Sequence, residues 1–523
     1  MTPLNSIGQR LVSNLQYARP HDDARTHDIS HAEKVNIVGA GGVLTAAYEQ
    51  LRNAAENTEE HLLLQKAIRR FYKQLFVTRD SRLINESGNE LAIELTFAGY
   101  IPNDTLTKSQ LDQVSNEAAS HYHAYEILQK RREVSAEKSS RWILDTLAVR
   151  TEHIINSHAS DNAFVDVAYA YYETIAPPSS VGIKKKSSEE YSAALFVAIH
   201  QALLKSNEAV VRSALLDRYQ VTVEDAEAFI TYNRQIDMLL NSSLTERLYR
   251  IVDRQGAPLR VIRRMIEDRP DIIDMLPKRE VFLEAYEQQV NREYANIGQR
   301  INRAVVRSVA FLIITKVLIG IAIEVPYDLW AHGMIIWGPL LINLCFPPLY
   351  MVALRLTHTL PSYANTTALV DRVDSMLYGE RTVLMRKQLL GKQYGSIFSF
   401  VYACLGLVVF GGVVWLLLMW NFSLVHIAIF FVFISAASFL GFRISRLIRE
   451  LEIVNAASNG LTFIRDMIYL PFVIVGQWMS DKYSQLNIVG LVLDMLIELP
   501  LKTVLRLIRQ WGAFLDDRKD RIV

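Results

Sequence analysis

The sequence predicts an all-α fold: a polytopic membrane protein with four transmembrane helices, an N-terminal cytoplasmic helical domain and C-terminal amphipathic helices at the membrane interface. Residues 308–442 are mostly apolar and contain four stretches near the roughly 20 residues that a helix needs to cross a bilayer. Residues 1–277 contain little of the alternation that marks strands. Residues 443–523 combine apolar and charged positions at helical spacing.

These regions predict four consecutive segments. Residues 1–277 form the helical domain, which a Pro-, Ser- and Lys-rich loop at residues 176–188 would divide in two. Residues 278–307 form a stalk helix, and residues 308–442 form the transmembrane block. Residues 443–523 form the interfacial helices.

Nine stretches of the first segment carry apolar residues at helical spacing. The expected helices cover residues 59–76, 90–99, 108–132, 141–157, 163–175, 190–205, 208–219, 223–241 and 244–255. The stretch around His27 and His31 is too polar to show such a pattern, and it is expected to be irregular.

The four spans are expected at residues 308–325, 333–356, 396–420 and 422–442, with a tight turn at Asn421. The link at residues 326–332 and the turn at Asn421 contain neither Lys nor Arg. The opposite ends are flanked by basic residues, including Arg300, Arg303, Arg307, Arg443, Arg446 and Arg449. The positive-inside rule therefore predicts cytoplasmic termini, insertion in the inner (plasma) membrane, and anionic lipid headgroups beside these arginines.

The stalk carries a seven-residue apolar repeat. Leu283, Val290, Ile297 and Ala304 recur at this spacing, and no proline interrupts the helix that leads into the first span. Such a helix can couple the cytoplasmic domain rigidly to the membrane or form a short coiled coil with a partner. The same repeat fits a helix packed on its own domain.

Polar residues inside the first two spans form the candidate site. Lys316 lies at the middle of the first span, Glu324 lies two turns further on, and Asn343 has a matching depth in the second span. A charge at this depth costs roughly 2.5–3.5 kcal/mol, so these side chains should face the bundle or water. Pro347 and Pro348 are expected to break or kink the second span.

Two interpretations of these residues stay open. Freed carbonyls beside Lys316, Glu324 and Asn343 could bind a cation or a proton, as in transporters with discontinuous helices. Alternatively, Lys316 bonds Asn343 or a free carbonyl and simply locks the bundle together.

The C-terminal region contains two further apolar segments. Residues 467–479 are short and contain Pro471, which favours an interfacial or re-entrant segment over a fifth span. Residues 487–514 carry a narrow polar stripe on a wide apolar body, which suits a helix lying among headgroups or packed on the bundle. In the third span, Gly406, Gly411 and Gly412 predict a close-packing face.

Two patterns resemble binding motifs without completing them. Gly39, Gly41 and Gly42 open like a dinucleotide fingerprint, but Leu44 occupies the third glycine position and no second strand with a terminal acid follows. The basic run at residues 66–73 lacks interleaved aromatic residues, so a solvated helix face is favoured over nucleic acid binding.

Catalytic and metal-binding chemistry find little support. The spacing of His27 and His31 could place both on one helix face, but solvated histidines are the simpler interpretation. Cys345 and Cys404, the two cysteines, lie in expected spans and offer neither a disulfide framework nor a zinc spacing. No catalytic residue, cofactor site or metal site is expected, and the chain is not expected to be an enzyme.

These patterns favour a membrane-anchored interaction or scaffold protein, whose partner is another protein or a second copy of the chain. The alternative is a cation or proton translocator that uses Lys316 and its neighbours. Four spans are few for a transporter, so this alternative would act as an oligomer.

Overall fold

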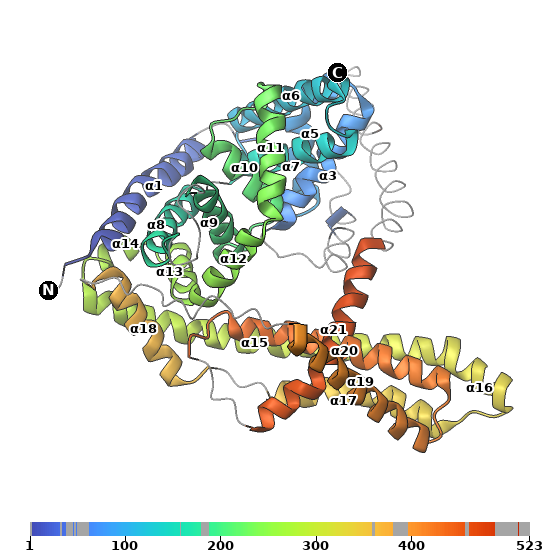
Figure 1. Ribbon diagram of the computed structural model, residues 1–523. Helices are drawn as coiled ribbons and strands as arrows, with labels where there is room; N and C mark the ends of the chain where they lie inside the picture. The colour runs from blue at the N-terminus through green and yellow to red at the C-terminus, as the bar shows by residue number, and fades with distance from the viewer. Residues whose placement is uncertain are drawn as a thin grey trace. The chain divides into compact units, whose positions relative to one another are not determined.

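The computed structural model describes residues 3–31, 34–37, 45–46, 49, 62–156, 158–178, 188–357, 361–379, 396–454, 460–486 and 511. These residues divide between two compact units. The helical unit comprises Ser6–Val252 together with Asn487–Val523, and the membrane unit comprises Met1–Asn5 together with Asp253–Leu486. The described residues contain helices and no strand, which confirms the all-α prediction (Figure 1).

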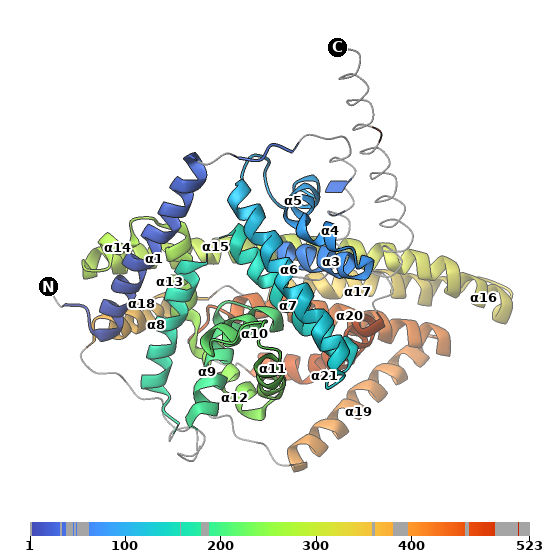
Figure 2. The same ribbon diagram turned by 90° about the horizontal axis from the view of Figure 1, so that it is seen from above.

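The helical unit confirms the nine expected helices within a few residues at each end. Its helices are α1 (Ser6–His31), α3 (Leu63–Thr78), α4 (Ser81–Asn85), α5 (Ser87–Phe97), α6 (Lys108–Arg131), α7 (Ala136–Ile155), α8 (Ala159–Ile175), α9 (Ser188–Leu203), α10 (Glu208–Arg218), α11 (Ala226–Leu240) and α12 (Ser243–Gln255). Helices α6 and α7 lie side by side in both ribbon views (Figures 1 and 2).

The prediction that residues around His27 and His31 are irregular is wrong. Helix α1 continues through His31. Its first turns bury Leu11 and Leu15 against α8, and Arg10 and Asp166 form an ion pair between the two helices. The polar stretch extends a helix that this packing has already nucleated, and extension is far easier than nucleation.

The described part of the membrane unit has ten helical elements. They are α13 (Ala257–Asp268), α14 (Ile272–Met275), α15 (Arg279–Ile319), the π-helix η3 (Gly320–Glu324), α16 (Val325–His332), α17 (Trp337–Thr357), α18 (Tyr363–Leu377), α19 (Ser396–Met419), α20 (Leu424–Arg449) and α21 (Gly460–Leu486). Four stretches are long and apolar enough to cross a membrane: Arg279–His332, Trp337–Thr357, Phe400–Met419 and Leu424–Arg449.

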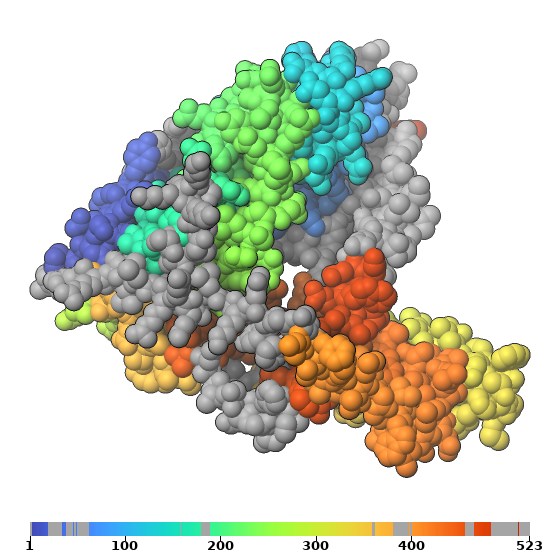
Figure 3. Space-filling model, viewed as in Figure 1, coloured from blue at the N-terminus to red at the C-terminus, as the bar shows by residue number. Residues whose placement is uncertain are grey.

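The apolar surfaces of these helices suit contact with lipid. In Figure 3 the orange α19 and the yellow end of α16 are uncovered on the face that is viewed. Leu407, Val408 and Trp415 on α19 are each more than half exposed. Contiguous apolar exposure of this kind is unfavourable in water and expected in a bilayer.

The first span is longer than expected. The link at residues 326–332 was expected to leave the helix, but η3 and α16 continue it to His332. The chain reverses at Gly333, whose φ of +69° is the left-handed conformation that glycine adopts readily at a helix end. The expected turn at Asn421 is confirmed, because α19 ends at Met419 and α20 begins at Leu424.

Helix α15 joins the stalk to the first part of the first span without a break, and η3 and α16 complete the span. Its N-terminal half contacts α13, α14 and α18 and buries Phe282, Tyr286 and Val290. Of the interpretations offered by the apolar repeat, this burial favours a helix packed within its own unit.

The prolines do not break their helices. Helix α17 is continuous through Pro347 and Pro348, and α21 is continuous through Pro471. The expected breaks at these positions are therefore wrong, whereas the kink that was the alternative at Pro347 and Pro348 stays a prediction. Helix α21 packs along α20, and a Cβ atom at Gly476 would lie 2.2 Å from the carbonyl oxygen of Ser435. Tertiary packing of this closeness holds a helix together across a missing backbone donor.

Several sequence-based predictions lie outside the described residues. These are the glycines at residues 39–42, most of the loop at residues 176–188, the basic loop after α18 and nearly all of the helix expected at residues 487–514.

Candidate functional site

Three of the five residues proposed for the site lie together in the membrane unit. Lys316 on α15 contacts Glu324 at the end of η3 through Nζ and Oε1, and the two side chains are 2% and 0% exposed. Asn343 on α17 donates from Nδ2 to the same oxygen of Glu324 at 3.0 Å. Lys316 Nζ also lies 4.9 Å from the ring centroid of Phe433 on α20.

The π-helix explains how Lys316 and Glu324 meet. At about 100° per residue, positions i and i+8 of a regular α-helix differ by about 80° around the axis. A π-turn absorbs about one extra residue, which reduces this offset to about 20°. The π-helix Gly320–Glu324 lies between the two residues and so returns Glu324 to the face that carries Lys316.

Asn343 joins this pair to α20. Its Nδ2 also donates to the backbone carbonyl of His426 at 3.2 Å. Asn343 is completely buried, so it connects the first, second and fourth spans through one side chain. The match in depth between Lys316 and Asn343 that the sequence suggested therefore corresponds to contact with a shared partner, Glu324.

A second buried pair adjoins the first and was missed from the sequence. His426 Nε2 lies 3.6 Å from Asp328 Oδ1, and both side chains are completely buried. The other oxygen of Asp328 accepts from the backbone N–H of Ile336 at 3.0 Å. Ser423, the N-cap of α20, places its Oγ 2.7 Å from His426 Nδ1.

A signal for the second pair was present in the sequence. Glu324, Asp328 and His332 follow one another at i+4 spacing, which places them on one face of a helix. Because the first span was expected to end at residue 325, Asp328 and His332 were placed outside the helix, where this spacing predicts no shared face. His426 lies close to the uncharged turn at Asn421, and nothing in its local sequence points to Asp328.

The site reaches the surface of the unit at one end. His332 Nδ1 lies 3.8 Å from Asp328 Oδ1, and the His332 side chain is 38% exposed. Along the helix axis His332 lies about 24 Å from Lys316. We call these polar residues the buried polar series: Lys316, Glu324, Asn343, His426, Asp328 and His332. The link between its two halves runs from the Asn343 side chain to the backbone carbonyl of His426.

Towards the other end of the bundle, apolar side chains replace the polar ones. The buried cluster there consists of Ile301, Val305, Leu312, Met351, Phe433, Ala437 and Ile448. Beside Met351 and Gly441 it contains a void of about 10 Å³, at the lower limit for a single water molecule. The buried polar series thus meets an apolar plug on the Arg307 side of Lys316.

The remaining predicted site residues lie apart from the charged pairs. Pro347 and Pro348 are buried in α17, one turn beyond Asn343, and no polar contact between them and Lys316 is seen among the described residues. The six arginines Arg300, Arg303, Arg307, Arg443, Arg446 and Arg449 are all exposed on α15 and α20. They flank the end of the bundle that contains the apolar plug.

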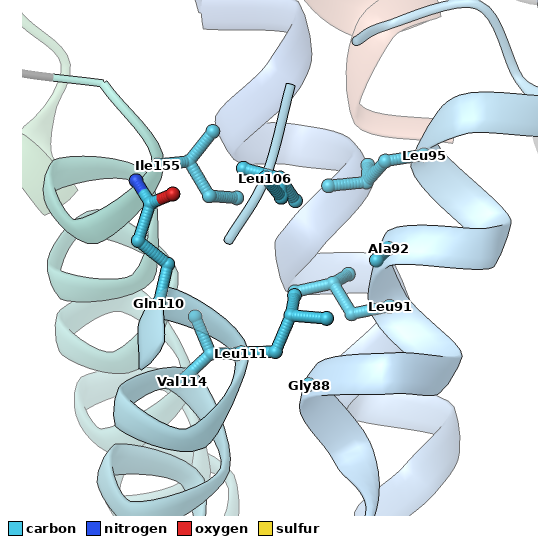
Figure 4. Close-up of a pocket in the computed structure, with 9 residues that line it drawn as sticks. All are labelled: Gly88, Leu91, Ala92, Leu95, Leu106, Gln110, Leu111, Val114 and Ile155. Atoms are coloured by element: carbon cyan, nitrogen blue, oxygen red, sulfur yellow. The ribbon is translucent and has the colours of Figure 1, made fainter. Parts of the chain in front are cut away.

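The helical unit offers no comparable site among its described residues. Figure 4 shows a recess in it, which is lined by apolar side chains of α5, α6 and α7, by Leu106 before α6, and by Gln110. The recess has no room for a water molecule, and Gln110 is occupied by the cap of α6 and by the carbonyl of Ile154. It is therefore part of the core.

The basic run on α3 is partly committed to internal contacts. Arg69 Nε lies 2.6 Å from Asp145, and Arg70 lies 2.7 Å from Glu49. The expectation of a simply solvated face is wrong for these two residues, because each supplies the counter-charge for a largely buried carboxylate.

Comparison with known proteins adds no assignment: no family model, no curated protein and no solved structure matches this chain. The buried polar series combines an ammonium, two carboxylates and two imidazoles, all groups that exchange protons reversibly. At membrane depth such groups mark ion and proton pathways.

Proposed function

We propose that the membrane unit translocates a proton or a small cation through the buried polar series. The observation that supports this is the buried Lys316–Glu324 pair, joined by Asn343 and His426 to a second pair at Asp328. A purely structural lock requires one satisfied pair, whereas this series continues to the exposed His332. We place this role ahead of simple anchoring, and the chain is not proposed to catalyse a reaction.

The proposed orientation follows from charge. The six exposed arginines on α15 and α20 favour contact with anionic headgroups, at about 1 kcal/mol each near the surface. We infer that this end faces the cytoplasm, with both termini on that side, in the inner (plasma) membrane. His332 and Trp330 would then face the outside, where aromatic side chains are common at the interface.

The test is transport by the full chain reconstituted in vesicles. Lys316→Met removes the titratable ammonium, and Lys316→Arg keeps a charge that does not release its proton at accessible pH. Both variants should lose proton-driven or cation-driven flux, whereas Lys482→Met, at an exposed position on α21, should keep it. Vesicles with the unaltered chain that show no flux under any proton, sodium or potassium gradient would refute the proposal.

A membrane-anchored interaction or scaffold role is the second candidate. It is supported by the helical unit, whose described part has a continuous hydrophobic core. Its partner would be another protein or a second copy, without nucleic acid. Extraction in a mild detergent followed by native mass measurement should yield a stable complex with a different protein, whereas a lone monomer would contradict this role.

A further inference from the structure

Eight buried side-chain polar atoms in the described part of the membrane unit have no hydrogen-bond partner. Four of them lie together in the buried polar series: Glu324 Oε2, Asp328 Oδ1, Asn343 Oδ1 and His426 Nε2. Each belongs to a completely buried side chain of the buried polar series. Buried polar atoms are satisfied in nearly all proteins, so such a cluster indicates a bound water or ion.

The spacing of these atoms suits a chain of proton carriers. Glu324 and Asp328 are one helical turn apart, so their Cβ atoms lie about 6 Å apart on one face of the helix. Each has one oxygen bonded or paired, by Lys316 and Asn343 on Glu324 and by the Ile336 N–H on Asp328. The second oxygen of each accepts no hydrogen bond, although Asp328 Oδ1 also faces His426 Nε2 and His332 Nδ1. A water molecule that bonds both of these oxygens would have the two to four polar partners that it needs.

The ring of His426 is oriented toward Asp328. Ser423 Oγ accepts from the backbone N–H of His426 at 3.4 Å, so its own proton can be donated to Nδ1 at 2.7 Å. The ring proton then resides on Nε2, which faces Asp328 Oδ1. His426 is in this way a positioning residue for Asp328.

Among the described residues, the route reaches the surface at His332. His332 is exposed and faces Asp328, whereas the apolar cluster around Leu312 and Met351 closes the other side of Lys316. The charged groups that act on His426, which faces Asp328, are Asp328, Glu324, Lys316 and His332 on the first span, and the ring of Tyr327 also lies against it.

We propose that the face of the first span formed by Glu324, Asp328 and His332 is a proton entry route, so that the ion carried by the membrane unit is a proton. This rests on the proposed function and names its substrate. The His332 imidazolium gives a proton to the Asp328 carboxylate, which leaves a neutral imidazole and a neutral acid. Asp328 passes the proton through the bridging water to Glu324, and neutral Glu324 releases the Lys316 ammonium from its pair.

The first test measures proton uptake by vesicles containing the full chain and an internal pH-sensitive dye. Asp328→Asn should slow uptake by about 100-fold or more, the usual contribution of a positioned acid–base group. Asp481→Asn, an exposed acid on α21, is the matched control and should leave uptake unchanged. His426→Asn should alter the pH profile of uptake, and His426→Gln, which can keep an amide donor near the Nε2 position that faces Asp328, should alter it less.

The outcomes separate this proposal from the proposed function. Normal proton uptake by Asp328→Asn would overturn the entry route and leave translocation standing. Flux of sodium or potassium without proton movement would overturn the choice of a proton and also leave translocation standing.

A second measurement does not depend on flux. Infrared difference spectra of the full chain should show the carbonyl band of a buried protonated carboxyl group, which Asp328→Asn removes. The absence of this band, or a band that Asp328→Asn leaves unchanged, would overturn the entry route even if the vesicles transport nothing.

Discussion

The partner of Lys316 decides what its removal does. The sequence suggested Asn343 or a free carbonyl as the bonding group, and on that basis Lys316→Met would be well tolerated. The structure pairs Lys316 with Glu324, so the single substitution leaves a buried carboxylate without its counter-charge. Breaking a buried pair from one side costs about 3–5 kcal/mol, whereas replacing both charges is often neutral.

This difference gives a stability prediction. Lys316→Met should lower the free energy of unfolding by about 3–5 kcal/mol, and the double variant with Glu324→Gln should recover most of that loss. Thermal unfolding of the four members of this double-mutant cycle in detergent measures the coupling. Equal losses from the single and double variants would mean that the pair contributes nothing as a pair.

Buried titratable groups in the helical unit make its stability depend on pH, with one sign for two histidines and the opposite sign for Glu152. Burial lowers the pKa of His121 and of His200 to about 4 from the usual 6.5, so their contribution to stability is lost as pH falls below about 6.5. Burial raises the pKa of Glu152 to about 7 from the usual 4.5. The folded state therefore binds an extra proton between these values, and stability falls as pH rises through them.

Glu152→Gln isolates the second of these effects. Gln resembles the neutral carboxyl group, so the variant should be more stable than the unaltered chain above about pH 7 and equal to it below about pH 4.5. Between these limits the difference should grow by up to about 1.4 kcal/mol per pH unit. Melting curves of both proteins across this range provide the measurement, and a difference that is independent of pH would contradict the raised pKa.

At the scale of single helices, tertiary packing overrides the local preference of proline for ending a helix. Helix boundaries in the helical unit followed from apolar spacing, because that spacing reflects which face is buried. Pro347, Pro348 and Pro471 were expected to interrupt helices, since proline lacks a backbone donor, but packing across α17, α20 and α21 keeps the helices intact. Local sequence carries no information about that packing.

Glycine contacts between α20 and α21 can be tested directly. Gly476→Ala should be strongly destabilising, because its Cβ would overlap the Ser435 carbonyl on α20 and backbone cannot yield as a side chain does. We expect a loss of about 1–3 kcal/mol, the usual penalty for overpacking.

The third span supplies the matched control for this prediction. No atom lies within 4 Å of a Cβ built at Gly411 or Gly412, and Gly406 meets only Pro471, at 3.9 Å. The close-packing face predicted for this span is therefore not used within the described chain. Gly411→Ala should leave the melting temperature unchanged or raise it slightly, since alanine favours helix by about 1 kcal/mol. Equal losses at Gly476 and Gly411 would show that neither contact controls stability.

For the whole molecule, composition predicted the class of protein and the number of spans, because the length of an apolar stretch is set by bilayer thickness. The site could be predicted only in part. Lys316, Glu324 and Asn343 were recognisable because charge and amide groups are conspicuous in apolar stretches. Asp328 and His332 were hidden by a wrong helix end, and His426 by a contact between residues far apart in sequence.

The distribution of charge predicts how the chain is oriented in the membrane. Exporting the helical unit would require the arginines on α15 and α20 to be outside, which the positive-inside rule disfavours. We therefore expect Ala331, beside the entrance at His332, and Ser81, on exposed α4, to lie on opposite sides of the membrane. In a background with Cys345→Ala and Cys404→Ala, an impermeant thiol reagent added to intact cells should label Ala331→Cys and leave Ser81→Cys unlabelled until the cells are permeabilised. The reverse pattern would invert the orientation, so that His332 would take up protons from the cytoplasm, and labelling of both positions in intact cells would show that they are not separated by the membrane.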